Sequence, residues 1–505
     1  MVEIELKFQI EPARQDAVRL AVAGSGARAQ TIRLQARYFD TPDGRLAAAG
    51  LALRLRREGR SRWVQTLKGR GDGLMRRLEH ELVLPPGGPA ALDLARHAGT
   101  PAGAALRAAL GPRAAELVER FSTDIRRTRR VVRAKGAAGE SALIELACDE
   151  GWIHATRNDG PQRLAVAEVE FELLSGPPQA LLALASRWVQ RHSLWLDVRS
   201  KAERGHGLAA GVPSAATLAQ TPLISRRMTP ARALAAMAQA ALAQALPNLA
   251  VLAEAGPVEP EYLHQLRVGL RRLRTALREF GAGVQGVDAT WRATLAQVFG
   301  TLGALRDRDV IEQTLALPRA AAQRMGLAMS AARAPLRGTA APRTRDTAVF
   351  RERGLHRLLL ALIGLTLAAE QTQRGTPLID VARKRLTRLH RTVMADAARF
   401  DALDDAARHV LRKRLKRLRY SLDFVAPLFA AKAVTRYLAL LKPAQEVLGD
   451  ANDVALAEAA CLAAGTHDAG DAFVLGWLNA RRGALSASAA ARLKVLAAAP
   501  RFWKA

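Results

Sequence analysis

The pattern of hydrophobic and polar positions divides the chain into a strand-rich region and a helical region. In the first region, hydrophobic and polar residues alternate with a two-residue period at residues 3–8, 51–57, 62–68, 79–84, 142–151 and 166–174. This period is typical of strands with one buried and one polar face. Helical stretches such as residues 177–192 stand among them. The pattern predicts an α+β fold with a mainly antiparallel sheet.

A linker follows the strand-rich region. Residues 208–222 are mostly small, uncharged and interrupted by proline, a composition typical of linkers. After them, leucine, alanine and arginine recur at helical spacing and the strand pattern fades. We therefore expect an α+β domain at 1–207, a linker at 208–222 and an all-α domain at 223–505.

The helical region contains an internal repeat. The stretch HQLRVGLRRLRTAL (264–277) resembles HVLRKRLKRLRYSL (409–422). A Leu-Gly pair and an acid-Val pair follow each copy, at 302–310 and 448–454. This duplication predicts two related helical halves, about 223–370 and 376–505.

Charge is distributed unevenly between the regions. The 505 residues carry a formal net charge of +29, with 33 Lys and Arg against 24 Asp and Glu up to residue 215, and 43 against 23 after it. Such an excess predicts a polyanionic partner, above all for the helical half. The two cysteines, Cys148 and Cys461, exclude a disulfide framework and favour the cytoplasm. The longest apolar run, residues 358–369, is too short to span a bilayer, so we expect no membrane insertion.

Charged side chains on the strands are sorted by sign. Glu3 and Glu5 alternate with hydrophobic residues, as do Glu168 and Glu170, whereas other strands carry Arg or Lys at such positions: Arg54, Arg56 and Lys68. Because each strand carries charged side chains of mainly one sign, the pattern predicts a closed antiparallel barrel with a wet interior. This interior would have an acidic patch and a basic patch. Clustered glutamates without His or Cys suit Mg²⁺ or Mn²⁺, and Arg and Lys suit phosphate oxygens. The alternative is a set of solvated strand faces with cross-strand ion pairs.

These motifs resemble a CYTH domain, the triphosphate tunnel metalloenzyme family. Its ExExK signature matches Glu3, Glu5 and Lys7. Further matching stretches follow in the family's order: 38–46, 51–56, 66–68, 77–82, 121–129, 144–151, 168–176 and 200–205. The resemblance covers the first domain and implies an eight-stranded antiparallel tunnel that acts on triphosphate groups with a divalent metal.

The resemblance also implies roles for single residues. It assigns catalytic roles to Glu3, Glu5, Lys7, Lys68 and Lys201. The metal ligands that it implies are Glu3, Glu5, Glu168 and Glu170. The residues that it implies for binding the phosphate chain are Arg54, Arg56, Arg77, Arg127 and Arg204. Arg126 is the alternative to Arg127, and Asp149 is a weaker candidate because an acid at a strand end is often a turn former.

The helical region shows basic stripes on both copies of the repeat. On a helix, residues three and four apart share a face, so the repeats align these side chains: His264, Arg267, Arg271 and Arg274 in one copy, and His409, Arg412, Lys413, Lys416 and Arg419 in the other. Like charges stacked in this way destabilise an isolated helix, which favours a polyanion as their partner. The alternative is a solvated helix face paired to nearby acids. The region resembles a CHAD domain, a family associated with polyphosphate binding.

The order of the two domains resembles bacterial inorganic triphosphatases. We therefore expect metal-dependent hydrolysis of inorganic triphosphate, with long-chain polyphosphate bound by the helical domain in the cytoplasm or at polyphosphate granules. Alternatives are an organic triphosphate as substrate, in a thiamine triphosphatase or adenylyl cyclase, and a non-catalytic granule-binding protein. Nucleic acid is the rival partner, but basic and aromatic residues do not interleave. No GxSxG or GxxxxGK[ST] motif is present, which excludes a serine elbow and a Walker site.

Overall fold

The described part of the chain forms two compact units. In the computed structural model, the described residues are 2–25, 29–71, 73–85, 91–136, 139–211, 214–254, 256, 259–328, 347–368, 376–465 and 468–504. The first unit comprises Met1–Thr217, Leu246–Ala253 and Phe350–Gly364, and the second comprises Leu218–Ala245, Glu254–Val349 and Leu365–Ala505. The domain boundaries at 207 and 222 stay a prediction, and two short segments from the later sequence pack with the first unit.

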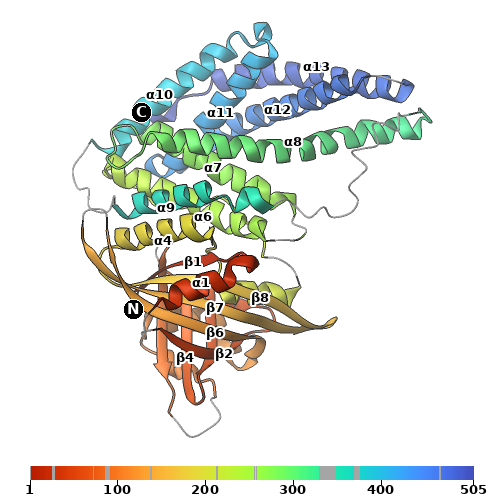
Figure 1. Cartoon of the computed structure of the whole chain (residues 1–505). Coiled ribbons are helices and arrows are strands. Elements are labelled where there is room, and N and C mark those ends of the chain that lie inside the picture. Colours follow the sequence, from red (N-terminus) through yellow and green to blue (C-terminus); the bar gives the residue numbers. More distant parts are fainter. Residues whose placement is uncertain are drawn as a thin grey trace. The chain divides into compact units, whose positions relative to one another are not determined.

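Eight antiparallel strands close into a barrel in the first unit (Figure 1), as the fold class predicted. Their order is β5-β4-β3-β2-β6-β7-β8-β1, and the pairing of β1 with β5 closes the ring. A short strand, β9, adds to β1 outside the ring. The bounds are β1 (Val2–Gln9), β2 (Gln30–Asp40), β3 (Leu51–Glu58), β4 (Arg62–Arg70), β5 (Arg76–Val83), β6 (Val118–Lys135), β7 (Ser141–Arg157), β8 (Gly160–Ser175) and β9 (Trp195–Leu196).

Short helices cover the outside and one part of the inside of the barrel. Leu106 and Leu110 pack on Leu53 and Leu67, so a helix shields the apolar outer face of β3 and β4. The helices of this region are α1 (Gln15–Ala23), α2 (Arg45–Ala48), α3 (Pro101–Leu110), α4 (Pro178–His192) and α5 (Lys201–Ala210). Ser200 and Glu203 form a capping box that fixes the start of α5.

One part of the barrel interior is apolar. Tyr38, Phe121 and Ile125 belong to a buried cluster with Ala202 of α5. Ile125 is two residues from Arg127, so the cluster shares its strand face with charged side chains. The interior is therefore divided into a packed apolar part and a charged part, whereas the sequence predicted a wet interior throughout.

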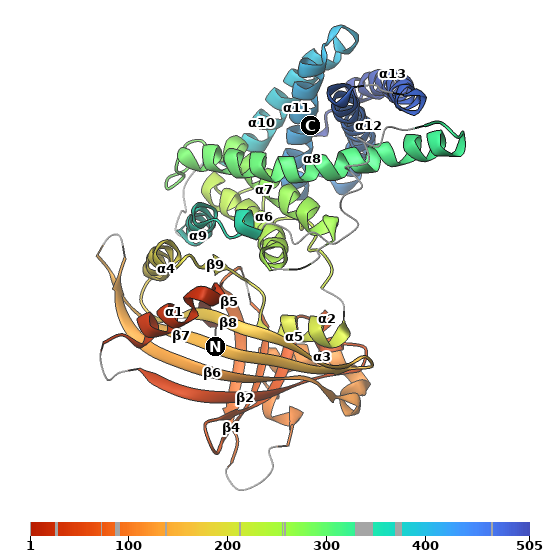
Figure 2. The same ribbon diagram turned by 45° about the vertical axis from the view of Figure 1, so that its right-hand side comes forward.

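The second unit is helical, as predicted. Successive helices pack as neighbours, with α7 against α8, α10 against α11 and α12 against α13 (Figure 2). The bounds are α6 (Pro230–Ala253), α7 (Pro260–Phe280), α8 (Thr290–Arg324), α9 (Arg353–Ala368), α10 (Leu378–Ala397), α11 (Asp405–Val425), α12 (Ala431–Ala464) and α13 (Ala469–Ala497). The C-terminal part of α6, Leu246–Ala253, and most of α9, up to Gly364, belong to the first unit.

One helix in the described part of the chain, α6, is long and apolar enough to cross a membrane. Its most apolar window is 72% buried inside the fold, as in a core helix, so the feature is weak support for a membrane span.

Gly205 gives a test of how α5 packs inside the barrel. A Cβ at this position would lie 2.2 Å from the ring of Phe121. We expect Gly205→Ala to lower the free energy of unfolding of the first unit by about 1–3 kcal/mol, because the ring has no free space to move into. Urea denaturation measures this loss. Adding Phe121→Leu should recover part of it, and purely additive losses in the double variant would contradict the packing.

Candidate functional site

Strand register brings the charged residues of the barrel together. Lys7 of β1 lies opposite Glu170 of β8, and Gln9 lies opposite Glu168. On the other side of β8, Asp149 of β7 lies opposite Glu168. Since side chains alternate between the faces of a strand, these residues share the interior face.

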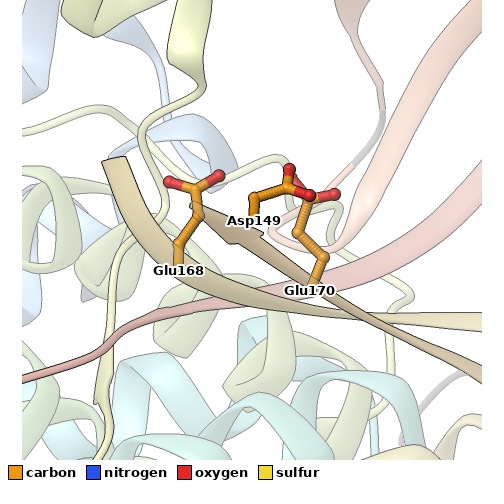
Figure 3. A group of neighbouring side chains, drawn as sticks. All are labelled: Asp149, Glu168 and Glu170. Atoms are coloured by element: carbon orange, nitrogen blue, oxygen red, sulfur yellow. The ribbon is translucent and has the colours of Figure 1, made fainter. Parts of the chain in front are cut away.

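Three carboxylates form the acidic centre of the interior. The side chains of Asp149, Glu168 and Glu170 come from the neighbouring strands β7 and β8, and each offers an oxygen within 4.8 Å of the others (Figure 3). Asp149 and Glu168 are fully buried. Buried carboxylates this close together require compensating positive charge.

Lys201 and Arg127 supply that charge. The Lys201 Nζ atom lies 2.6 Å from Asp149 Oδ2 and 2.9 Å from Glu170 Oε1, and it also contacts Glu168. Arg127 donates two hydrogen bonds of 2.7 Å to Asp149 and contacts Glu170. Burial alone would raise the pKa of Glu170, but Lys201 and Arg127 outweigh it and hold that pKa well below its ordinary value. Lys201 and Arg127 therefore favour the ionised forms of Asp149 and Glu170, whose pKa values are both lowered.

A second acidic pair shares one lysine. Lys68 Nζ is 3.0 Å from a carboxylate oxygen of Glu3 and 3.0 Å from one of Glu79. Burial raises the pKa of Glu3 to about 8, and Glu79 and Glu5 add to this against the opposing effect of Lys68. Two carboxylates with one lysine thus retain a proton at neutral pH.

The predicted phosphate-binding arginines also lie at this interior. Arg54 donates to the hydroxyl of Tyr38 at 3.3 Å, and Arg56 contacts Glu81 at 3.2 Å. Arg77 is 3.5 Å from Glu5 and donates to the backbone oxygen of Val198. Each arginine is held by a protein partner that a bound anion would replace or share.

The structure distinguishes the two adjacent arginines of β6. Arg127 contacts the acidic centre, whereas the side chain of Arg126 is 57% exposed and pairs with Glu150. Arg127 is therefore the residue on the interior face.

Arg204 contacts the acidic centre from α5. It lies 3.2 Å from Glu168 and donates to the backbone oxygen of Ala165 at 2.8 Å. Because the residue is only 8% exposed, its contacts are those of a support for Glu168.

A chain of hydrogen bonds supports Glu168 from the other side. Gln9 donates from its amide nitrogen to Glu168 and to Asp197, both at 3.2 Å. Asp197 accepts from Arg199, which also donates to the backbone oxygen of Ala250. The acidic centre is thus connected to a segment from the later sequence that belongs to the first unit.

The donor set fits a hard divalent cation. Asp149, Glu168 and Glu170 offer only oxygen atoms, which suits Mg²⁺ or Mn²⁺. Glu3 and Glu5 stand outside this trio in the structure and pair with Lys68 and Arg77. The assignment of the metal to Glu3 and Glu5 stays a prediction.

Sequence reasoning underrated Asp149 and missed Glu79. The pattern suggested that the strand ended near Asp149, but β7 continues to Arg157. Gly151 permits this because a Cβ there would lie 2.1 Å from the backbone oxygen of Asp124 on β6. The alternation of Glu79 with Glu81 was the available signal for the second acidic pair.

The second unit contains a separate basic groove of about 1700 Å³. Nearly all of the predicted polyanion-binding side chains line it: His264, Arg267, Arg271, Arg274, His409, Arg412, Lys413 and Lys416. Arg419 is not among these lining residues and instead contacts Asp423 and Gln445. Acidic residues such as Asp307 and Asp453 also line the groove, and Asp453 lies 3.7 Å from Arg412. Among the described residues, neither histidine belongs to a group of potential metal ligands, and His409 shares a hydrogen bond of 2.6 Å with Asn452.

Phe299 organises one wall of this groove, and no sequence motif indicated it. The guanidinium carbons of three arginines lie over its ring, at 4.9 Å for Arg267, 4.9 Å for Arg271 and 5.5 Å for Arg274. Such contacts with an aromatic face are attractive and orient the cations. A single ring therefore gathers three charges that would otherwise repel one another.

Lys416 has an unusual ionisation in the groove. Burial lowers its pKa to about 6, and the neighbouring Arg271 and Arg412 add to the effect. Its amine is therefore mostly neutral above pH 7 until an anion enters the groove.

Comparison with known proteins agrees with both architectures. The closed barrel with acids and bases in its interior and the helical unit with its basic groove are the two folds that the resemblance implied. A CYTH domain model matches residues 1–206, and a CHAD domain model matches residues 236–462. The chain carries a CYTH domain followed by a CHAD domain.

Individual relatives cover parts of the chain. An inorganic triphosphatase of Haemophilus influenzae is 32% identical over 218 residues, which are 41% of this chain and 55% of that protein. This chain thus spans about half the length of that relative. The CHAD domain of Ricinus communis is 27% identical, with 57% of this chain and 98% of that chain covered and a TM-score of 0.45. A Hippeastrum protein, an adenylyl cyclase candidate with a dominant triphosphatase activity, is 16% identical, with 42% and 97% covered and a TM-score of 0.29.

The lowered pKa of Lys416 predicts selective chemistry. At pH 7 we expect an amine-acylating reagent to modify Lys416 faster than Lys413, because only neutral amines react and burial lowers the pKa of Lys416, whereas Lys413 lies on the exposed side of the same helix. Peptide mass spectrometry measures both rates in one sample. Inorganic triphosphate should slow the reaction at Lys416. Equal rates at the two lysines at pH 7 would contradict the assigned ionisation.

Proposed function

We propose that the barrel hydrolyses inorganic triphosphate to pyrophosphate and phosphate with Mg²⁺ or Mn²⁺. The observation that supports this most is a trio of carboxylates, the buried Asp149 and Glu168 and the half-buried Glu170, in contact with Arg127 and Lys201. A triphosphate and a divalent cation together carry charges of both signs, as this site does. The similarity to an inorganic triphosphatase over part of the chain supports the same activity.

The positively and the negatively charged residues have different roles in the proposed reaction. Arg54, Arg56, Lys68 and Arg77 bind phosphate oxygens and stabilise the charge on the departing pyrophosphate. Asp149, Glu168 and Glu170 hold the metal, with Glu3 and Glu5 as further carboxylates on its side. The cation, when bound, neutralises phosphate oxygens and orients the attacking water. Water adds to the terminal phosphorus, the bond to the bridging oxygen breaks, and the proton of the water passes to solvent or to an ionised carboxylate.

The packed part of the barrel favours an inorganic substrate. Tyr38 and Phe121 stack at 4.5 Å, and both are at most 3% exposed. An organic group such as adenosine or thiamine would need space among these side chains. Hydrolysis of tripolyphosphate, ATP and thiamine triphosphate by the purified protein tests the choice, and a preference for an organic triphosphate would overturn it.

We also propose that the groove of the helical unit binds long-chain polyphosphate. The groove presents a row of cations gathered by Phe299, and a flexible chain with one charge per phosphate matches such a row. Action in the cytoplasm or at polyphosphate granules, and the delivery of chains to the barrel, belong to the same proposal.

Adjacent residues on opposite strand faces give a matched test of the barrel. We expect Asp149→Asn and Arg127→Gln each to lower kcat/KM for tripolyphosphate by about 100-fold, because each removes a buried charge from the site. Their neighbours Glu150 and Arg126 face the other side, so Glu150→Gln and Arg126→Gln should stay within about twofold. Phosphate release assays with matched thermal melts check the effect. Equal losses in inner and outer variants would contradict the proposal.

The salt dependence of binding tests the groove. Removing two contacts in Arg271→Gln with Arg274→Gln should weaken polyphosphate binding and reduce the slope of log K against log salt by roughly 1.4, by analogy with about 0.7 for each contact on a single strand. The exposed pair Arg492→Gln with Lys494→Gln removes the same charge outside the groove and serves as the control.

Phe299→Leu tests the arrangement of the arginines over this ring without changing the charge of the groove. It should weaken binding while leaving the salt slope unchanged, because no cation is lost. Titrations with polyphosphate and with double-stranded DNA of equal charge measure these changes. Tighter binding of DNA at every salt concentration would promote the nucleic-acid alternative.

A further inference from the structure

The helical unit has a second cavity that the two proposed activities do not use. Its volume is about 460 Å³, and its walls come from the start of α12, the segment before it, α10 and the C-terminal segment. Apolar groups dominate these walls, among them Leu428, Phe429, Leu440 and Phe502. None of the residues that line the basic groove lines this cavity. A volume in this range suits a small organic molecule.

The rim of the cavity is positive. Arg226, Arg383 and Arg436 line it, and no Asp or Glu is among the described residues that do so. Arginine side chains around an apolar hollow select a ligand with an apolar body and an anionic group. A fully inorganic anion such as polyphosphate gains nothing from the apolar walls.

Aromatic rings make the inner wall rigid. Phe429 and Phe502 meet edge to face at 5.2 Å, and Tyr437 meets Phe502 at 5.8 Å. Tyr437 is 2% exposed, and its hydroxyl has no hydrogen-bond partner among the described residues. That hydroxyl is itself buried, so Tyr437 contributes its ring to the apolar wall of the cavity.

We propose that this cavity binds a small amphipathic organic anion, with an aromatic or acyl body between Phe429, Phe502 and Leu440 and a carboxylate, sulfonate or phosphate at Arg436. The site is distinct from the triphosphate site and from the basic groove. Such a ligand would give the protein a response to an organic metabolite that neither proposed activity requires.

Fluorescence of anilinonaphthalene sulfonate, which has an apolar body and one anionic group, tests the site on the full chain. We expect saturable binding of one equivalent that dodecanoate displaces and tripolyphosphate does not. The uncharged analogue N-phenylnaphthylamine should bind about tenfold more weakly. Complete displacement by tripolyphosphate would place the probe in a phosphate site and overturn the proposal.

Variants locate the probe. Ala433→Trp fills the cavity and should weaken binding at least about tenfold, and Arg436→Gln should weaken it severalfold. Lys432→Gln removes one charge from an exposed position on the same helix that does not line the cavity, and should leave binding within about twofold. Arg436 is itself exposed, so its variant tests the site even where Ala433→Trp disturbs folding. Unchanged binding in Arg436→Gln, or an equal loss in Lys432→Gln, would overturn the proposal.

Discussion

The barrel depends on the mutual neutralisation of buried acids and bases. Burying an isolated charge in such an interior costs more free energy than most single interactions contribute to stability. Each charged group therefore needs a partner of opposite sign. Lys201 and Arg127 compensate the charges of Asp149, Glu168 and Glu170. Lys68 pairs with Glu3 and Glu79, which retain one proton between them at neutral pH. The proposed metal–triphosphate substrate would exchange one set of ion pairs for another, which would limit the desolvation that binding requires.

The helical groove handles charge in a different way. It gathers cations with fewer acids among them, and its residues reduce their repulsion by two devices. Phe299 places an electron-rich ring beneath three guanidinium groups. Lys416 loses its proton at neutral pH. The first device fixes geometry, and the second lowers the positive charge that the groove carries at neutral pH.

The sequence predicted the elements better than it predicted the contacts between them. Two-residue alternation identified six of the eight barrel strands, all but β2 and β6, and placed Glu3, Glu5 and Lys7 on one face, because strand geometry is local. It could not show that β7 continues past Asp149, since Gly151 reads as a turn when the neighbouring strand is unknown. Nor could it find Phe299, which lies on a different helix from the arginines it contacts. The packed apolar part of the barrel was missed for the same reason: residues such as Tyr38 and Phe121 meet only when β2 pairs with β6, far along the sequence.

The interleaved sequence of the first unit has a consequence for how these two domains can be exchanged between proteins. Leu246–Ala253 and Phe350–Gly364 come after the linker, yet they belong to the unit that contains the barrel. His356 accepts a hydrogen bond from the backbone nitrogen of Leu196, one residue before Asp197, and Ala250 holds Arg199. A recombination event at the linker would therefore transfer the barrel without the two later segments that contact it. This arrangement favours inheritance of the barrel and the helical domain together. A helical domain from another protein would have to supply equivalents of Leu246–Ala253 and Phe350–Gly364.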